Sequence, residues 1–248
     1  MWTLKEKLDY LEETKLQIKQ AIIEKGIEVN DKDTFRSYVD KIREIKSSEF
    51  IMPQGMKFKD STMTEIPMMN TNNITDMTDV FNNCNKLLTI PELNFSNVTL
   101  MSRTFYNCSS MVNIPFIDTF NVINMDNAFY GCTSLKRIES IDFRLVDTVD
   151  GIFTECNNIT YLNIIGLGTS PNIYTYDFSD ISKWGDANIE TDARTSLLNT
   201  FQNNICDRKS HNMNEIVTLK LHKDVEKRFT QELKNSLTKK GYKISVAP

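Results

Sequence analysis

The stretch NVTLMSRTFYNCSS, residues 97–110, carries a phenylalanine and a cysteine three positions apart, Phe105 and Cys108. The same Phe-x-x-Cys motif recurs with a step of 24 residues, at Phe81 and Cys84, Phe129 and Cys132, and Phe153 and Cys156. Five further apolar columns keep this step: Ile74, Val98, Val122 and Val146; Met77, Met101, Met125 and Val149; Leu87, Met111, Leu135 and Ile159; Ile90, Ile114, Ile138 and Leu162; Leu93, Ile117, Ile141 and Ile165. Seven apolar columns in one phase predict a repeat architecture.

The spacing within one repeat predicts its local structure. Four apolar residues at i, i+3, i+7 and i+10 indicate one face of a helix: Val98, Met101, Phe105 and Cys108. Asn97, like Asn73 and Asn121 in the same column, stands where an N-cap is expected. The runs MVNIPFI (111–117) and LKRIESI (135–141) then indicate a brief strand and a turn. One short helix and one short strand per repeat predict a solenoid of parallel strands.

The repeats define the middle of the chain. A partial copy (58–69) has Asp60 in the place of the cysteine and is expected to close one end of the stack, because terminal repeats are usually atypical. Full repeats follow at 70–93, 94–117, 118–141 and 142–165. We therefore predict an α+β fold with a repeat domain over residues 49–169.

The flanking segments lack the 24-residue period. Residues 1–48 predict a helical module whose two apolar stripes are Leu4, Leu8, Leu11, Ile18 and Ile22, and then Phe35, Tyr38, Val39, Ile42 and Ile45, with Asp33 as a cap. Residues 170–248 predict a strand–helix–strand cap with parallel strands, since such crossovers are normally right-handed and parallel. We expect the first module to attach or oligomerise the protein, as a homo-oligomer.

The repeat and the two flanking segments resemble segments of known protein families. The repeat FSNVTLMSRTFYNCSSMVNIPFI (95–117) is similar to the BspA-like, Treponema-type leucine-rich repeat. Residues 21–45 resemble a module common near the N-terminus of bacteriophage tail and fibre proteins, and the C-terminal segment resembles the cap of phage proteins that carry this repeat. The resemblance implies a leucine-rich-repeat solenoid, a structural role for the cysteines and a place in a phage virion.

Four cysteines in one column are compatible with disulfides, with a metal site or with simple packing in the core. Cysteines on successive coils would be close enough for a disulfide, yet a column of identical small side chains is also how a repeat core is built. A zinc site is disfavoured because no Cys-x-x-Cys motif exists. Neither His211 nor His222 lies near a recognisable nucleophile motif. We expect reduced core cysteines, no enzymatic activity, no metal and no cofactor.

Composition excludes further classes. The net charge is −4 and the pI about 5.4, and no basic cluster appears in the sequence, which argues against a nucleic-acid partner. No window approaches the roughly 18 apolar residues of a membrane span, and the N-terminus has no secretory signal. We expect neither membrane insertion nor secretion by a signal of this chain.

The surface positions of the strands vary from coil to coil, and solenoids bind through such variable faces. One column holds Thr89, Asn113, Arg137 and Tyr161, and another holds Glu92, Phe116, Ser140 and Ile164. Phe116, Arg137 and Tyr161 are of the types favoured at binding hot spots, although they could equally contact a neighbouring subunit.

We expect a non-enzymatic structural protein of a phage virion, assembled in the host cytoplasm. As a tail or head fibre it would contact other virion proteins through its N-terminal helices and a host protein or glycan through its repeats. The alternatives are a cell-surface adhesin of a bacterium or protist and, third, a glycan-cleaving fibre enzyme.

Overall fold

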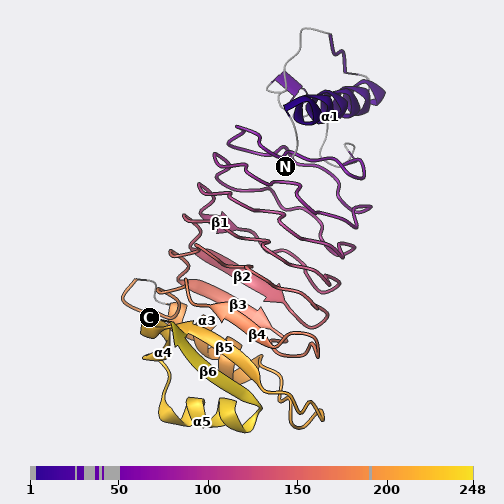
Figure 1. Ribbon diagram of the computed structural model, residues 1–248. Coiled ribbons are helices and arrows are strands. Elements are labelled where there is room, and N and C mark those ends of the chain that lie inside the picture. Colours follow the sequence, from indigo (N-terminus) through magenta and orange to yellow (C-terminus); the bar gives the residue numbers. More distant parts are fainter. Residues whose placement is uncertain are drawn as a thin grey trace.

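The computed structural model describes residues 4–25, 27–30, 37–38, 41, 51–189 and 192–247. The protein has a mixed α/β fold with short parallel strands and few helices. From residue 51 to residue 165 the chain runs in successive coils that lie side by side, with α1 (Leu4–Glu24) at one end of the molecule and α5 (Gln231–Lys239) at the other (Figure 1).

Short parallel strands join the coils. In the first sheet, β1 (Asn113–Ile114), β2 (Arg137–Asp142) and β3 (Tyr161–Ile165) pair in that order and in parallel. Isolated parallel bridges with a step of 24 residues connect the coils on another side: Asp76 to Leu100, Leu100 to Asn124, and Asn124 to Thr148. The predicted parallel strands are confirmed.

The helix predicted at Val98–Cys108 is wrong, because this segment is a run of tight turns. Two of its residues, Arg103 and Asn107, have positive φ angles of 53° and 55°, which a right-handed helix does not allow. The N–H of Phe105 donates to Ala128 O on the next coil at 2.8 Å, whereas the N–H of Cys108 donates to Phe105 O at 3.1 Å. Such turns place apolar side chains inward at a spacing that imitates a helix.

The predicted N-cap asparagines serve a different purpose. Asn97 Nδ2 donates to Asn72 O at 2.7 Å, and Asn121 Nδ2 donates to Ser96 O at 2.6 Å. Each amide therefore satisfies a backbone carbonyl of the preceding coil instead of a helical N–H group of its own. These hydrogen bonds tie neighbouring coils together.

The core between the coils is a ladder of phenylalanine rings. Phe58, Phe81, Phe105, Phe129 and Phe153 stack in succession, with centroids 5.4 to 5.7 Å apart and planes within 11° of parallel. Each stacked pair adds about 0.5–1.5 kcal/mol beyond the burial of its area. The other predicted apolar columns are also buried, with the exception of Ile165.

A β-bulge explains the exception. The register of β2 and β3 shifts between Ile138 and Ile141, so that Ile141 pairs with Ile164 and Asp142 pairs with Ile165. One extra residue in β2 opposes β3, as bulges require. Ile164, which we assigned to the variable surface column, is fully buried, and Ile165 is not.

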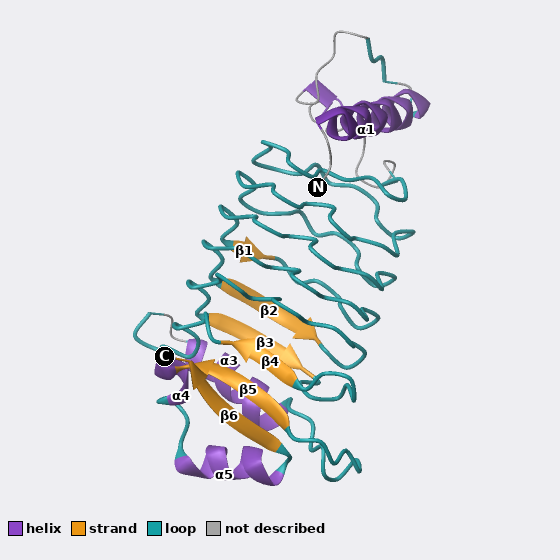
Figure 2. Ribbon diagram, viewed as in Figure 1, coloured by secondary structure: helices purple, strands orange, loops and turns teal. Residues whose placement is uncertain are grey.

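The C-terminal part adds a second parallel sheet of β4 (Thr175–Phe178), β5 (Val217–His222) and β6 (Tyr242–Ala247) (Figure 2). The helical elements α4 (Lys223–Glu226) and α5 connect β5 to the parallel β6, as expected of a strand–helix–strand unit. β4 was not predicted. Its Phe178 extends the aromatic ladder from Phe153 at 6.2 Å.

A helical segment protects the edge of the first sheet. It consists of α3 (Ala193–Leu198) followed by the π-helical η1 (Asn199–Asn203). The N–H of Leu162 donates to Ser196 Oγ at 3.3 Å, and the N–H of Ile164 donates to Thr200 Oγ1 at 3.0 Å. The backbone groups of β3 are thus satisfied by side chains, which prevents an exposed strand edge.

The N-terminal module is described only in part. In α1, Ile18 and Ile22 are buried as predicted, and so is Tyr38. The rest of both predicted stripes lies outside the residues whose side chains are described: Leu4, Leu8, Leu11, Phe35, Val39, Ile42 and Ile45, together with the cap Asp33. Within the described residues no helix is long and apolar enough to cross a membrane.

Candidate binding surface

Two of the three predicted binding residues lie together on the first sheet. Arg137 opens β2 and pairs in register with Tyr161, the first residue of β3. The guanidinium carbon of Arg137 lies 3.7 Å from the centroid of the Tyr161 ring, which is cation–π geometry. The 24-residue step therefore places these two side chains on adjacent strands, as the sequence predicts.

Ion pairs fix the position of Arg137. Its guanidinium donates to Asp192 through Nη1 and Nη2 at 3.1 and 2.6 Å and to Glu139 Oε1 through Nε at 2.5 Å. These hydrogen bonds, led by the one to Asp192, raise the pKa of Arg137 further above its ordinary value. The side chain is only 25% exposed. Arg137 is therefore a rigid, permanently charged side chain of the surface. The carboxylates of Asp192 and Glu139 accept its hydrogen bonds.

Phe116 lies apart from this pair. It follows β1 by two residues and occupies the position 24 residues before Ser140, not the column of Arg137. Its ring is 64% exposed. The structure thus brings Arg137 and Tyr161 together but places Phe116 as a separate apolar contact on the preceding coil.

A second group of exposed side chains was missed by the sequence prediction. The guanidinium of Arg144 lies 4.8 Å from the ring centroid of Phe120, one coil earlier, and Leu145 follows directly in the chain. Ile123 O accepts from the N–H of Asp147 at 2.8 Å, which places Ile123 beside the same coil. Phe120, Ile123 and Leu145 are all exposed. We call Phe120, Ile123, Arg144 and Leu145 the edge patch.

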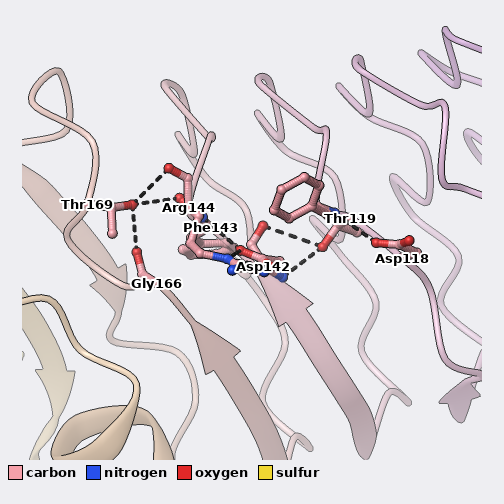
Figure 3. A network of polar contacts seen from close by, with 8 residues as sticks. Asp118, Thr119, Asp142, Phe143, Arg144, Gly166 and Thr169 are labelled. Carbon is pink, nitrogen blue, oxygen red and sulfur yellow. Dashed lines mark hydrogen bonds and ion pairs between the residues drawn. The ribbon is translucent and has the colours of Figure 1, made fainter.

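A polar network holds the edge patch in place (Figure 3). Arg144 Nε and Nη2 bind the carboxylate of Asp142 at 2.5 to 3.0 Å, and the side chain of Asp142 is almost fully buried. The N–H of Asp142 donates to Thr119 Oγ1 at 2.7 Å. Thr169 Oγ1 donates to Arg144 O at 3.0 Å from the following coil. The Asp142 carboxylate therefore orients the Arg144 guanidinium, and contacts from the neighbouring coils hold the backbone of both residues.

The signal that would have found the edge patch is present in the sequence. The column of Phe120 reads Asn72, Ser96, Phe120 and Arg144, a change from small polar to aromatic and then basic. The same kind of change marks Phe116 and Arg137 in the columns beside the strands. Residues that break the repeat on the turn side carry the same information.

The cysteines of the four Phe-x-x-Cys motifs, which we call the ladder cysteines, are free and buried. Each thiol donates to a backbone carbonyl on an earlier coil, for example Cys108 Sγ to Phe81 O and Cys132 Sγ to Phe105 O, both at 3.1 Å. Burial raises the pKa of Cys84 and of Cys156 to about 12 and that of the two cysteines between them as well. A neutral, buried thiol is a poor nucleophile and metal ligand. These four cysteines lie in the core, as the repeat spacing predicts.

Within the part of the chain that the structure describes, no group of three or more His, Cys, Asp or Glu side chains could hold a metal ion. The two histidines lie in the C-terminal part. There, His222 Nδ1 accepts from the N–H of Asp224 at 3.1 Å and caps α4.

Comparison with known protein families gives a match. Residues 52–163 match the model of a family described as "Mycoplasma protein of unknown function, DUF285". No curated protein and no solved structure matches the chain. The matched region is less than half of the chain, and it contains the stacked coils, the phenylalanine ladder and the surface residues described above.

Proposed function

We propose that this chain is a non-enzymatic binding protein that presents a leucine-rich-repeat solenoid of four 24-residue repeats to a partner. The single observation that carries the proposal is the exposure of apolar and arginine side chains on positions that break the repeat. Phe116 and the edge patch lie on coils whose interior is fixed by stacked rings and inter-coil hydrogen bonds. A rigid surface loses little conformational entropy on binding.

The chemistry of the patch indicates the kind of partner. Aromatic and arginine side chains are enriched at binding hot spots, and aromatic rings also stack on the apolar faces of sugars. The buried, carbonyl-bonded thiols support a structural core without a reactive nucleophile. We propose a host surface protein or glycan as the partner, bound weakly per site and strengthened by several copies of the chain.

We place the protein in a bacteriophage virion, as part of a tail or head fibre that is assembled in the host cytoplasm. In this proposal the N-terminal helices contact other virion proteins and oligomerise the chain. The order of the modules, a helical segment before the repeats and an α/β cap after them, supports this place. Mass spectrometry of purified particles tests it directly, and absence of the chain from the particles would overturn it.

A second candidate is a cell-surface adhesin of a bacterium. The observation that favours it is the match of residues 52–163 to a family described as a Mycoplasma protein. Fractionation of producing cells separates the two candidates. An adhesin would be found on intact cells and would be removed by external protease, whereas a virion component would sediment with particles.

The binding surface is tested with purified protein and bacterial cells. Phe120→Ser combined with Leu145→Ser removes the apolar part of the edge patch and is expected to reduce cell binding about tenfold or more. Tyr174→Ser is the matched control, because Tyr174 is also a large exposed side chain (56%) and lies outside the patch. Equal binding by both variants would exclude the edge patch as the contact surface.

A further inference from the structure

The second sheet ends in an open strand. Among the described residues, β6 pairs with β5 alone and stands at the edge of the order β4-β5-β6. Figures 1 and 2 show β6 as the outermost strand of this sheet, with α5 on the side of β6 that faces away from β5. This edge differs from that of β3, whose backbone groups are satisfied by Ser196 and Thr200. An open edge is a template for another strand.

The register identifies which groups face outward. The N–H of Val217 donates to Gly241 O at 3.2 Å, and Val217 pairs with Tyr242. Because hydrogen-bonding directions alternate along a strand, Lys243 and Ser245 direct their backbone groups toward β5. Ile244 and Val246 direct theirs toward the open edge.

The side chains at this edge are only half covered. Ile244 and Val246 pair with the buried residues Leu219 and Leu221 of β5, so they lie on the core face of the sheet. Ile244 is partly buried against the core, whereas Val246 is 47% exposed. An added strand would therefore bury apolar side chains next to these two residues.

A groove runs along the same edge. Its volume is about 570 Å³, and its lining includes Ile216, Ile244 and Val246 as well as Lys209, Lys234 and Lys243. Glu226 also lines it and is paired with Lys234. The lining of the groove thus combines apolar side chains with lysines.

Charge distinguishes this end from the rest of the chain. Residues 206–247 contain ten Lys and Arg side chains and five Asp and Glu side chains, whereas the whole chain has a net charge of −4. The basic residues form no run in the sequence, and the fold gathers three lysines at one groove. Lys209 and Lys243 form no ion pair with any described residue. A positive field of this kind selects an acidic partner.

We propose that the open edge of β6 binds an extended, acidic segment of another protein by strand addition. Alternate apolar residues of that segment lie against Ile244 and Val246, and the acidic residues between them lie near Lys243. A second copy of this chain is a poor occupant, because pairing of two β6 edges brings Lys209 and Lys243 of both copies together. This inference does not depend on the proposed function, which concerns Phe116 and the edge patch.

The test uses the full chain and a fluorescein-labelled heptapeptide of alternating glutamate and valine. We expect fluorescence anisotropy to show saturable binding of this peptide and not of the matched lysine–valine peptide. Val246→Pro removes an outward N–H and keeps every hydrogen bond to β5, so it is expected to weaken binding about tenfold or more. Val246→Thr keeps the N–H and is the control. Lys243→Glu is expected to lower the affinity for the peptide and to make that affinity less dependent on the salt concentration.

Three results would overturn the proposal. The first is no binding of the glutamate–valine peptide at millimolar concentration, or equal binding of both peptides. The second is unchanged binding by Val246→Pro in a protein whose circular dichroism and thermal unfolding match those of the parent. The third is a dimer in sedimentation equilibrium that Val246→Pro converts to a monomer, since the edge would then be occupied by a second copy.

Discussion

Cys108 Sγ lies 3.1 Å from Phe81 O, so that the thiol of one coil donates a hydrogen bond to the backbone of the coil before it. The same contact recurs at the other three cysteines of the ladder: Cys84 to Phe58, Cys132 to Phe105 and Cys156 to Phe129. Phe58, Phe81, Phe105 and Phe129 therefore each contribute a ring to the core and a carbonyl to a cysteine of the next coil, which lies 27 residues later, or 26 for Phe58. The Phe-x-x-Cys motif is an inter-coil contact.

This burial predicts selective thiol reactivity. In the native protein we expect iodoacetamide to label Cys206, which is partly exposed, and to leave the four ladder cysteines unlabelled. Urea at about 8 M unfolds most domains. Under these conditions all five cysteines should be labelled. Peptide mass spectrometry reports the sites. Labelling of Cys108 in the native protein at the rate of Cys206 would contradict the buried ladder.

The raised thiol pKa values predict that stability falls at high pH. An unfolded thiol loses its proton near its ordinary pKa of 9.0, whereas folding raises the pKa of Cys84 and Cys156 to about 12. The native state therefore binds more protons above pH 9, and the free energy of unfolding decreases as pH rises from 9 toward 12. The expected slope is about 1.4 kcal/mol per pH unit for each thiol.

Urea unfolding at several pH values between 7 and 11 measures this slope. Lysine and tyrosine residues also titrate in this range, so the informative comparison is between the parent and Cys156→Ala. The variant is less stable at neutral pH because of the cavity, but its stability should decline less steeply above pH 9. Parallel pH profiles for the two proteins would show that Cys156 does not contribute.

The sequence predicts the interior of the repeat well and its backbone poorly. The 24-residue step identifies the buried columns and the parallel direction of the strands, because both follow from identical packing in each coil. It misses the turns, since Arg103 and Glu155 are not residue types that favour a positive φ. Hydrogen bonds to the next coil, such as that from Phe105 N–H to Ala128 O, hold these residues in the turns.

The sequence likewise predicts one part of the candidate surface and misses another. The adjacency of Arg137 and Tyr161 follows from the repeat, because a residue of one coil meets its equivalent in the next. The partner Asp192 is 55 residues from Arg137 and lies outside the repeat, so no periodicity predicts it. The bulge in β2 is equally invisible in the spacing, and it moves Ile164 into the core.

Removal of the Arg144 guanidinium should destabilise the third and fourth coils. The side chain of Asp142 is almost fully buried, and Arg144 supplies its bidentate partner. Arg144→Ala leaves this carboxylate without that partner, at an expected cost of about 1–3 kcal/mol. Arg144→Lys should recover part of the loss, because a lysine is a point charge without the planar fork. Thermal unfolding measures both, and an unchanged midpoint for Arg144→Ala would contradict the assigned role.

Gly131 should be intolerant of a side chain. It has a φ of 70°, and a Cβ atom there would lie 2.2 Å from Asn107 Oδ1. Asn107 Nδ2 in turn donates to Asn83 Oδ1 at 3.1 Å, so the clash disturbs a ladder of amides. We expect Gly131→Ala to cost about 2–3 kcal/mol, of which about 1 kcal/mol is the left-handed conformation itself. Gly55→Ala is the control, since Gly55 has a φ of 74° with no heavy atom within 4 Å of the new Cβ. Equal losses for the two variants would exclude the clash.

The capping of β3 by side chains of α3 and η1 predicts a local opening when they are removed. Thr200→Val is nearly isosteric and leaves the N–H of Ile164 without an acceptor inside the core. An unsatisfied buried donor costs about 1–3 kcal/mol. Ser196→Ala affects more groups, because Ser196 Oγ also accepts from Trp184 Nε1 at 3.3 Å and donates to Ala193 O at 2.8 Å.

Hydrogen exchange with mass spectrometry separates this local effect from a general loss of stability. In Thr200→Val we expect faster exchange in the peptides that cover β3 and unchanged exchange in those that cover the phenylalanine ladder near Phe105, because local opening need not involve the whole structure. Thr195→Val lies on the exposed side of α3 and is the matched control. Exchange that accelerates equally in β3 and in the ladder would mean that Thr200 supports the fold as a whole and not the edge of one strand.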